Sequence, residues 1–413
     1  MKPVIYYLSI CLFLLTSCNN FNKGERESIP VLDIKQGLNN LTKMNLTDFK
    51  SNIRYVRLET NKNCLVTNTI RNIYVEENKI FIRDNDPFLK VFDANTGKYL
   101  YNIGSKGQGP GELPSLRHVD MNVKEKRVIF GWAKVYKYDF EGNYLSNIEL
   151  PKIPAKESDD IISDNVVILD TDLYSVGAYS VAEHQHNAVY IFDEQSKIIN
   201  TLKSYDDYIQ HHTIKTNSNY DQLGFYYKCE GRIHFYRGIC DTVYAYDSSI
   251  RAFKPSFCFD FGKHRRSRHY ANIDTDNKDE ISVKTICENN QFIFMDLSTN
   301  KASTEPFMDK NVRGDGKLVE FLNHSVYALY DKQSMIFSFL LQPVKGIRGF
   351  ANDIDNGLPF WPKYISSKNE FVDIIQASDF IEYADKLPKP DNSFREILES
   401  MDEEDNPIVI IAY

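Results

Sequence analysis

Basic side chains form the densest group of residues in this sequence that could bind a ligand. In a chain with a formal net charge of −8, seven consecutive residues read Lys263-His264-Arg265-Arg266-Ser267-Arg268-His269. Guanidinium groups make paired hydrogen bonds to phosphate, sulfate and carboxylate groups. The run follows an apolar stretch, Phe257–Phe261, and Gly262, so we expect it in an exposed loop. The candidate anion-binding residues are therefore Arg265, Arg266, Arg268 and His269; the alternative is a solvated loop that binds nothing.

Trp361 is a second candidate ligand-binding residue. It is one of only two tryptophans and lies in the segment Phe360-Trp361-Pro362. An exposed tryptophan can stack on a sugar ring, whereas a buried one would only pack against the core. Both interpretations stay open from the sequence alone.

Metal and catalytic motifs are not recognisable. His184-Gln185-His186 and His211-His212 have ligand-type side chains, but no third ligand follows at a known spacing, so we predict no metal site. There is no G-x-S-x-G or HExxH motif and no carboxylate pair whose spacing indicates a glycosidase, so the catalytic residues are unknown. The negative net charge also argues against general nucleic-acid binding.

The elements that must position these candidates repeat along the chain. In Phe81–Asn122, short β-branched and aromatic runs alternate with turn formers, as in successive β-hairpins. An aromatic or apolar residue followed by Asp recurs with spacings of 46, 54, 54, 49 and 35 residues. We interpret the Asp as a turn initiator rather than a catalytic group. Repeats of this length are typical of β-propellers, and six units are predicted at Asp93, Asp139, Asp193, Asp247, Asp296 and Asp331.

One segment carries a more specific resemblance. IFIRDNDPFLKVFDANTGKYLYNIGSKGQGPGEL, which begins at Ile80, is similar to the NHL-type repeat, with its V-F-D strand, glycine turn and G-x-G-x-G-E loop. Residues 50–413 as a whole resemble the six-bladed β-propeller lipoproteins of the NHL-like/TolB-like group of Gram-negative gut bacteria. The resemblance implies an all-β fold, a six-bladed β-propeller, and supplies no catalytic residues.

The N-terminus is typical of an exported lipoprotein. Lys2 precedes an apolar run, Val4–Leu15, that matches a signal peptide over residues 1–17. Leu15-Thr16-Ser17-Cys18 resembles a bacterial lipobox, which implies cleavage before Cys18 and lipidation of that residue, with palmitate among the acyl chains. Asn19 in place of Asp favours the outer membrane, with the leaflet open. Residues 18–49 are polar and are expected to form a tether, unless part of them packs as an outer strand.

The C-terminal hundred residues depart from the repeat. The spacing of Phe371, Ile374, Ile375 and of Phe394, Ile397, Leu398 predicts a helical decoration over about 370–401, interrupted by prolines. A closing strand is predicted at about 407–413, in which Ile408–Ala412 pairs beside Tyr55–Leu58.

Five cysteines remain after Cys18, so not all can pair. A disulfide between Cys229 and Cys240 and buried free thiols are both open, since an exported domain meets an oxidising environment.

Two functions remain. The first is an envelope lipoprotein, a monomer anchored to the membrane by its lipid, that binds or scaffolds a glycan, a peptide or an envelope protein through its propeller. The alternative is a propeller lyase or hydrolase that acts on a polysaccharide or a lactone. No cofactor is predicted, apart from a Ca²⁺ ion that the channel of a propeller could hold. Whether the protein is an enzyme stays open, because a site assembled from several blades leaves no local motif.

Overall fold

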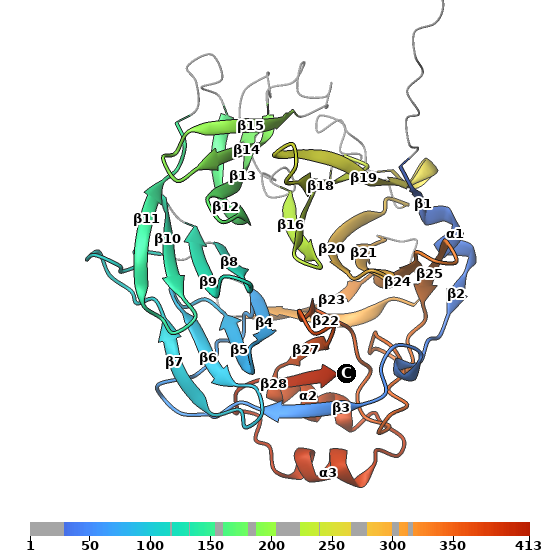
Figure 1. Cartoon of the computed structure of the whole chain (residues 1–413). Coiled ribbons are helices and arrows are strands. Elements are labelled where there is room, and N and C mark those ends of the chain that lie inside the picture. The colour runs from blue at the N-terminus through green and yellow to red at the C-terminus, as the bar shows by residue number, and fades with distance from the viewer. Residues whose placement is uncertain are drawn as a thin grey trace, which may run out of the picture.

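The fold is a ring of six β-sheet blades (Figure 1). The computed structural model describes residues 29–413 except 116–117, 132, 153–159, 181–186, 204–223, 239, 266–278, 300–304 and 313–316. Each blade contains four antiparallel strands, and short helices lie near the C-terminus. The predicted fold class, a six-bladed β-propeller with C-terminal helices, is therefore confirmed.

The first five blades follow one another along the chain, and the sixth combines both chain ends. From the innermost strand outward, blade 1 is β4 (Asn72–Glu76), β5 (Lys79–Arg83), β6 (Leu89–Asp93) and β7 (Tyr99–Ile103); blade 2 is β8 (His118–Asn122), β9 (Arg127–Gly131), β10 (Lys134–Asp139) and β11 (Tyr144–Glu149); blade 3 is β12 (Asp160–Asp170), β13 (Leu173–Ser180), β14 (Asn187–Asp193) and β15 (Ile198–Lys203). Blade 4 is β16 (Phe225–Cys229), β17 (Arg232–Tyr236), β18 (Thr242–Asp247) and β19 (Ala252–Asp260); blade 5 is β20 (Ser282–Glu288), β21 (Phe292–Ser298), β24 (Ser325–Asp331) and β25 (Ile336–Leu340); blade 6 is β26 (Tyr364–Ile365), β27 (Phe371–Ile375), β28 (Ile408–Ala412) and β3 (Ile53–Arg57).

The core lies between the blades. In β5 the consecutive residues Ile80, Phe81 and Ile82 are all buried, although neighbouring side chains of a strand point to opposite faces. Ile80 and Ile82 pack with residues of blade 6, while Phe81 packs with residues of blade 2. Both faces of a blade are therefore covered by neighbours, which explains why the strands are so rich in aromatic and β-branched residues.

The repeated aspartates initiate turns, as expected. Asp93 Oδ1 accepts hydrogen bonds from the backbone N–H groups of Asn95 and Thr96, at 3.0 and 2.7 Å. Asp139, Asp193, Asp247 and Asp331 accept equivalent bonds after the third strands of their own blades. Each carboxylate satisfies backbone donors that the turn would otherwise leave unpaired.

The assignment of a separate unit to Asp296 is wrong. Asp296 lies in β21, the second strand of the blade whose third strand ends at Asp331, which explains the short spacing of 35 residues. A two-stranded hairpin, β22 (Phe307–Val312) and β23 (Leu318–Asn323), is inserted between β21 and β24. The number of blades is still six. Five blades have a turn aspartate after the third strand, and blade 6 has none after its third strand, β28.

Blade 6 closes the ring. β28 pairs with β3 from Ile408 opposite Arg57 to Ala412 opposite Ile53, which is the pairing expected from the sequence apart from Leu58. Tyr413 N donates to Asn52 O at 2.9 Å, so the two chain ends meet where other blades have an aspartate turn. All five residues of β28 are buried, because the strand lies between β27 and β3.

In residues 29–49 the structure shows the alternative to the predicted tether, in which part of the segment packs as an outer strand. β1 (Val31–Asp33) adds a parallel strand to β19, α1 (Ile34–Asn39) follows, and β2 (Leu41–Thr42) pairs with β25. A 3₁₀ turn, η1 (Leu46–Asp48), leads to β3. Leu32 and Ile34 are buried against residues of blades 4 and 5, and Leu46 is buried against residues of blades 5 and 6. Residues 29–49 therefore wrap around these blades. Residues 1–28, including Cys18, lie outside the described residues.

The C-terminal decoration begins later than predicted. Phe371, Ile374 and Ile375 belong to β27, and the helices are α2 (Ala377–Ala384) and α3 (Asn392–Glu399). A short apolar run has the same spacing in a buried strand and in a buried helix, so periodicity could not separate them. No helix in the described part of the chain is long and apolar enough to cross a membrane.

Cys229 and Cys240 are not joined by a disulfide. Cys229 ends β16 beside the turn into β17, and Cys240 follows the far end of β17, so the whole length of that strand separates them. A short 3₁₀ turn, η5 (Gly262–His264), follows β19.

The alternating strand directions define two ends of the ring. The turns between first and second strands and between third and fourth strands lie at one end, which we call the turn end. The segments that enter the first strands, the β22–β23 hairpin and the α2–α3 insertion lie at the opposite end, which we call the cavity end.

Candidate functional site

A cavity of about 800 Å³ opens around the axis toward the cavity end. The innermost strands of all six blades contribute to its wall, from Asn72 in β4 to Tyr364 in β26. Residues of β21, β22, β24, β27 and α2 complete it. Its polar side chains thus come from segments that are far apart in the sequence, from Asn68 before blade 1 to Tyr383 in α2.

An ion pair between blades 2 and 4 forms part of the cavity wall. Lys228 of blade 4 lies 2.6 Å from Asp120 of blade 2, and its ammonium also donates to Met121 O. Asp120 is 5 % exposed and accepts a second hydrogen bond from the backbone N–H of Ile168 in blade 3, at 2.8 Å. This pair ties three blades together, and a buried carboxylate held in this way depends strongly on its partner.

His118, the first residue of β8, borders the cavity beside this pair. Burial lowers the pKa of its imidazole to about 3, and the charges of Arg83 and Lys228 act in the same direction. The ring is therefore neutral near pH 7 and can donate one hydrogen bond and accept another.

Lys284 enters the cavity because β20 contains a bulge. Val283 pairs with Leu297 and Thr285 pairs with Asp296, so Lys284 has no partner in the β20–β21 register. Both Lys284 and Thr285 are exposed, whereas regular alternation would turn one of them away. The Lys284 ammonium donates to Ser325 Oγ at 2.6 Å.

Arg348 is held between aromatic rings. Its guanidinium carbon lies 4.1 Å from the ring centre of Tyr327 and 4.8 Å from that of Phe307, and Nη1 lies 2.9 Å from Asp296 Oδ1. Tyr327 in turn stacks on Trp361 with ring centres 4.2 Å apart. Cation–π stacking and the carboxylate fix the orientation of this guanidinium.

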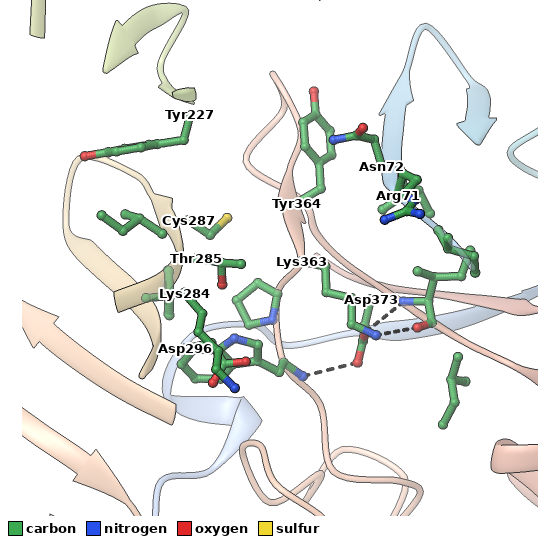
Figure 2. A pocket seen from close by; sticks show the side chains of 18 of the residues that line it. Arg71, Asn72, Tyr227, Lys284, Thr285, Cys287, Asp296, Lys363, Tyr364 and Asp373 are labelled. Atoms are coloured by element: carbon green, nitrogen blue, oxygen red, sulfur yellow. Dashed lines mark hydrogen bonds and ion pairs between the residues drawn. The ribbon is translucent and has the colours of Figure 1, made fainter. Parts of the chain in front are cut away.

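Blade 6 lies between these residues and blade 1. Lys363 is 2.8 Å from Asp373, and its ammonium also donates to Ile374 O at 2.5 Å. Figure 2 shows Lys284, Thr285 and Cys287 entering from one side, Arg71 and Asn72 from the other, and Lys363 and Tyr364 between them.

The two insertions of the cavity end are joined. Lys310 of β22 lies 3.0 Å from Glu382 of α2, and Asp309 and Asp379 from the same elements line the cavity. Burial, with the charge of Glu382, raises the pKa of the Asp379 carboxyl.

Phenol groups dominate the rest of the polar surface. Burial raises the pKa of Tyr74, Tyr226, Tyr227, Tyr327 and Tyr364. Burial also raises the pKa of the Cys287 thiol to about 12. These groups stay protonated near neutral pH. Tyr74, Tyr227 and Tyr364 donate their protons to Val119 O, Glu288 and Glu76, so the phenol oxygens can still accept hydrogen bonds from a ligand.

Of the residues predicted as sites, the structure describes Arg265 and Trp361. Arg265 pairs with Asp241 at 2.5 Å and is absent from the cavity wall, and Arg266, Arg268 and His269 lie outside the described residues. Trp361 does border the cavity, but it is 5 % exposed and stacks on Tyr327 rather than presenting an open face.

Sequence reasoning missed Lys284, Arg348 and the Lys228–Asp120 pair. They come from different blades, and the bulge that exposes Lys284 leaves no mark in the local pattern Ser282–Glu288. In the described residues no group of three His, Cys, Asp or Glu side chains is placed to hold a metal ion.

Six four-stranded blades around a polar axial cavity define a six-bladed β-propeller. Residues 29–413 match the family described as a domain of unknown function, DUF4934, and the chain belongs to this family. The match begins at the N-terminal wrap, which agrees with the packing of residues 29–49 onto blades 4, 5 and 6.

A solved structure shares this fold. A protein of Bacteroides fragilis named as exported is 19% identical, with a TM-score of 0.62 over 93% of this chain and 99% of that one. A more distant match, a member of the DUF4221 family from Bacteroides vulgatus, is 8% identical, with a TM-score of 0.48 over 88% of this chain and 96% of that one. No curated protein matches the chain.

Proposed function

We propose that this protein is an envelope lipoprotein whose propeller binds a glycan in its axial cavity. The observation that supports the proposal is the cavity of about 800 Å³, whose polar side chains come from five of the six blades and from the segments that join them, while the described part of blade 3 contributes Val167. Pockets of this size hold ligands of a few hundred daltons. One or a few sugar rings fit such a volume.

The chemistry of the wall suits hydroxyl-rich ligands. Asp120, Asp296 and Asp373 each lie beside a cation, so their remaining lone pairs can accept from a neutral ligand without leaving a bare charge. The O–H groups of Tyr74, Tyr227 and Tyr364 already donate to Val119 O, Glu288 and Glu76, so the protonated tyrosines offer a ligand their oxygen lone pairs and flat apolar faces. Sugars need this combination, because each ring carries hydroxyl groups at its edge and C–H groups on its faces.

The protonation states of the wall residues favour binding over the alternative of a lyase or hydrolase. Acid–base catalysis needs a group whose pKa lies near the working pH. Here the pKa of His118 is lowered to about 3, and burial raises the pKa of the tyrosines far above neutrality. A binding role uses these groups in the protonation states that their surroundings favour.

Membrane attachment rests on the sequence features of the N-terminus. The signal peptide at residues 1–17, the lipobox that ends at Cys18 and Asn19 support an outer-membrane lipoprotein. The NHL-like repeat and the exported Bacteroides fragilis protein of the same fold agree with a protein that works in the envelope.

The test is a thermal-shift screen of a soluble form that begins at residue 19, with neutral and acidic oligosaccharides, peptides and Ca²⁺ as ligands. A ligand that binds the native state raises its apparent stability by mass action. Stabilisation by an oligosaccharide that is recovered unchanged supports the proposal. Stabilisation only by peptides, or conversion of the sugar to a product, would contradict it.

Replacement of Cys18 tests the anchor. The Cys18→Ala variant cannot be lipidated, so we expect it in the soluble envelope fraction, whereas the parent protein sediments with membranes. Cys11→Ala, inside the signal peptide, is the matched control and should leave the mature protein on the membrane. A Cys18→Ala protein that still sediments with membranes would show that the lipid is not the anchor.

A further inference from the structure

We infer that the seam between blades 5 and 6 is a subsite for an acidic substituent, a carboxylate or a sulfate ester, on the bound sugar. Lys284 and Arg348 are the two residues that would hold it. The inference rests on the proposed function, because it specifies the class of glycan that the cavity takes.

The first step is the position of Lys284. The bulge in β20 exposes this lysine to the cavity beside Thr285, where regular alternation would have sent one of the two away. Bulges recur beside binding sites because an extra residue re-aims a side chain. A bulge interrupts the hydrogen bonds between strands, and in β20 it exposes the Lys284 ammonium to the cavity.

The second step is the charge of Lys284. Its ammonium is bonded to the hydroxyl of Ser325, and within the described residues it forms no ion pair with a carboxylate. Lys228 and Lys363, the other lysines of the wall, each have an aspartate partner, at 2.6 and 2.8 Å. Lys284 thus differs from them in keeping donors and an uncompensated charge for a ligand.

The third step is the fixed guanidinium of Arg348. Nη1 is bonded to Asp296, while the guanidinium also lies against the rings of Tyr327 and Phe307. A guanidinium has five N–H donors, so most of its donors remain for a planar acid group. Phe307 belongs to the inserted hairpin, which gives that insertion a role in orienting the site.

The fourth step places both cations together. Ser325, which holds Lys284, and Tyr327, which holds Arg348, are two residues apart on β24 and therefore share one face of blade 5. Asp296 is the cross-strand partner of Tyr327 on that same face. Lys284 and Arg348 are thus anchored on one face, within one strand pair.

The charges of the wall also limit the ligand. Asp309 and Asp379 line the same cavity and would repel a ligand that carries many negative charges. We therefore expect selectivity for a sugar with a single acidic group in the cavity over a densely charged polymer.

Isothermal titration calorimetry of the soluble form from residue 19 tests the inference with three probes: a galactose trisaccharide in which one residue is galacturonate, a monosulfated galactose trisaccharide and galactotriose. The probes separate the two sources of the acidic group from the uncharged ring. We expect one acidic probe to bind at least tenfold more tightly than galactotriose, because hydrogen bonds between charged groups are about twice as strong as neutral ones.

The Lys284→Met variant should weaken binding of the acidic probe by about 10- to 100-fold and leave the affinity for galactotriose unchanged. Lys254→Met, at the turn end, is the matched control and should leave both affinities unchanged. Arg348→Lys keeps the charge but loses the planar fork, and an intermediate loss is expected.

The outcomes separate this inference from the proposed function. Equal affinity for acidic and neutral probes, or an unchanged affinity in Lys284→Met, overturns the acidic subsite and leaves glycan binding standing. Failure of all three probes and of the oligosaccharides in the thermal-shift screen overturns the proposed function and this inference with it.

Discussion

The two ends of the propeller are built in different ways. At the turn end, five blades repeat the same device, in which an aspartate after the third strand accepts backbone hydrogen bonds within a tight turn. At the cavity end, the segments differ from blade to blade and include a β-hairpin, a pair of helices and the polar wall of a cavity. The turns of the turn end depend on residues that are close in the sequence, and they repeat from blade to blade. The contacts of the cavity end join residues that are far apart in the sequence, and they differ from blade to blade.

This difference indicates which end carries stability and which carries specificity. Each aspartate turn forms its hydrogen bonds within one blade, so its conformation does not depend on the other blades. A cavity wall assembled from the side chains of several blades can change its ligand by single substitutions while the ring persists. Loops and insertions on a rigid scaffold are the usual place for binding residues.

The largest effect is expected from deletion of β28, the strand that closes the ring. We expect deletion of Pro407–Tyr413 to abolish cooperative folding, because it removes a strand whose five residues are all buried and exposes the edges of β27 and β3. Circular dichroism during thermal unfolding measures this. Tyr413→Ala is the control, since that side chain is exposed, and it should melt like the parent. A truncated protein with the parent's cooperative transition would refute closure by β28.

Matched lysines at the two ends sharpen the comparison. Lys228→Met leaves the nearly buried Asp120 without its cation, so we expect a loss of about 2–3 kcal/mol in the free energy of unfolding. Lys254→Met breaks an ion pair with Asp247 in which the lysine side chain is 55% exposed. Such a surface pair is screened by water and salt, so we expect no loss beyond the error of the measurement. Urea unfolding of both variants at pH 7 measures the difference. Equal losses would mean that the Lys228–Asp120 pair between blades 2 and 4 is no more important than a surface pair.

The same contrast explains how much could be predicted from the sequence. The strands of blade 1, the aspartate turns of blades 1 to 4 and the closing strand could be predicted, because turn formers and apolar runs are local. Asp296 was wrongly counted as a repeat position because, like the turn aspartates, it follows an apolar residue. In the structure it pairs with Arg348, 52 positions along the chain.

The cavity could not be predicted for the same physical reason. Lys228 and Asp120 are 108 positions apart, and neither has a sequence neighbour that marks it. The most conspicuous local pattern, the basic run at Lys263–His269, contributes no described residue to the cavity wall. Local patterns reveal loops and turns, while this site depends on which residues of different blades face the axis.

The pH dependence of stability should reveal a contribution from His118, which lies at the cavity end. The pKa of His118 is lowered from its ordinary value near 6.5 to about 3, so between these values the unfolded chain binds a proton that the folded protein does not. Stability from this group is therefore full above pH 6.5 and falls as pH decreases through that window. We expect His118→Gln to reduce the loss of stability between pH 6.5 and 4.5 by about 1–2 kcal/mol, less than the full linkage value because the ring borders the cavity.

Urea unfolding of the parent and of His118→Gln at several pH values measures this difference. Other titrating groups are shared by both proteins, so only the change in slope matters. Parallel curves for the two proteins would show that the His118 ring is protonated as readily in the folded state as in the unfolded one.

The smallest measurable effect is expected from a single aspartate at the turn end. Asp93→Ala removes the acceptor for the N–H groups of Asn95 and Thr96. The loss of such a local cap costs roughly 1 kcal/mol in the free energy of unfolding, which urea unfolding can measure. Asp93→Asn keeps an acceptor oxygen and should recover most of that loss at neutral pH. Because hydrogen bonds from Thr96 lower the pKa of Asp93, the advantage of Asp over Asn should disappear as pH falls below about 4.

The two Asp93 variants also test whether the ends of a blade are independent. Neither substitution should alter binding in the cavity, since the turn lies at the opposite end of blade 1. Titration of each variant with the sugar that the parent binds measures this. An altered ligand affinity in Asp93→Ala would show that the two ends are coupled through blade 1 and are not independent parts of one scaffold.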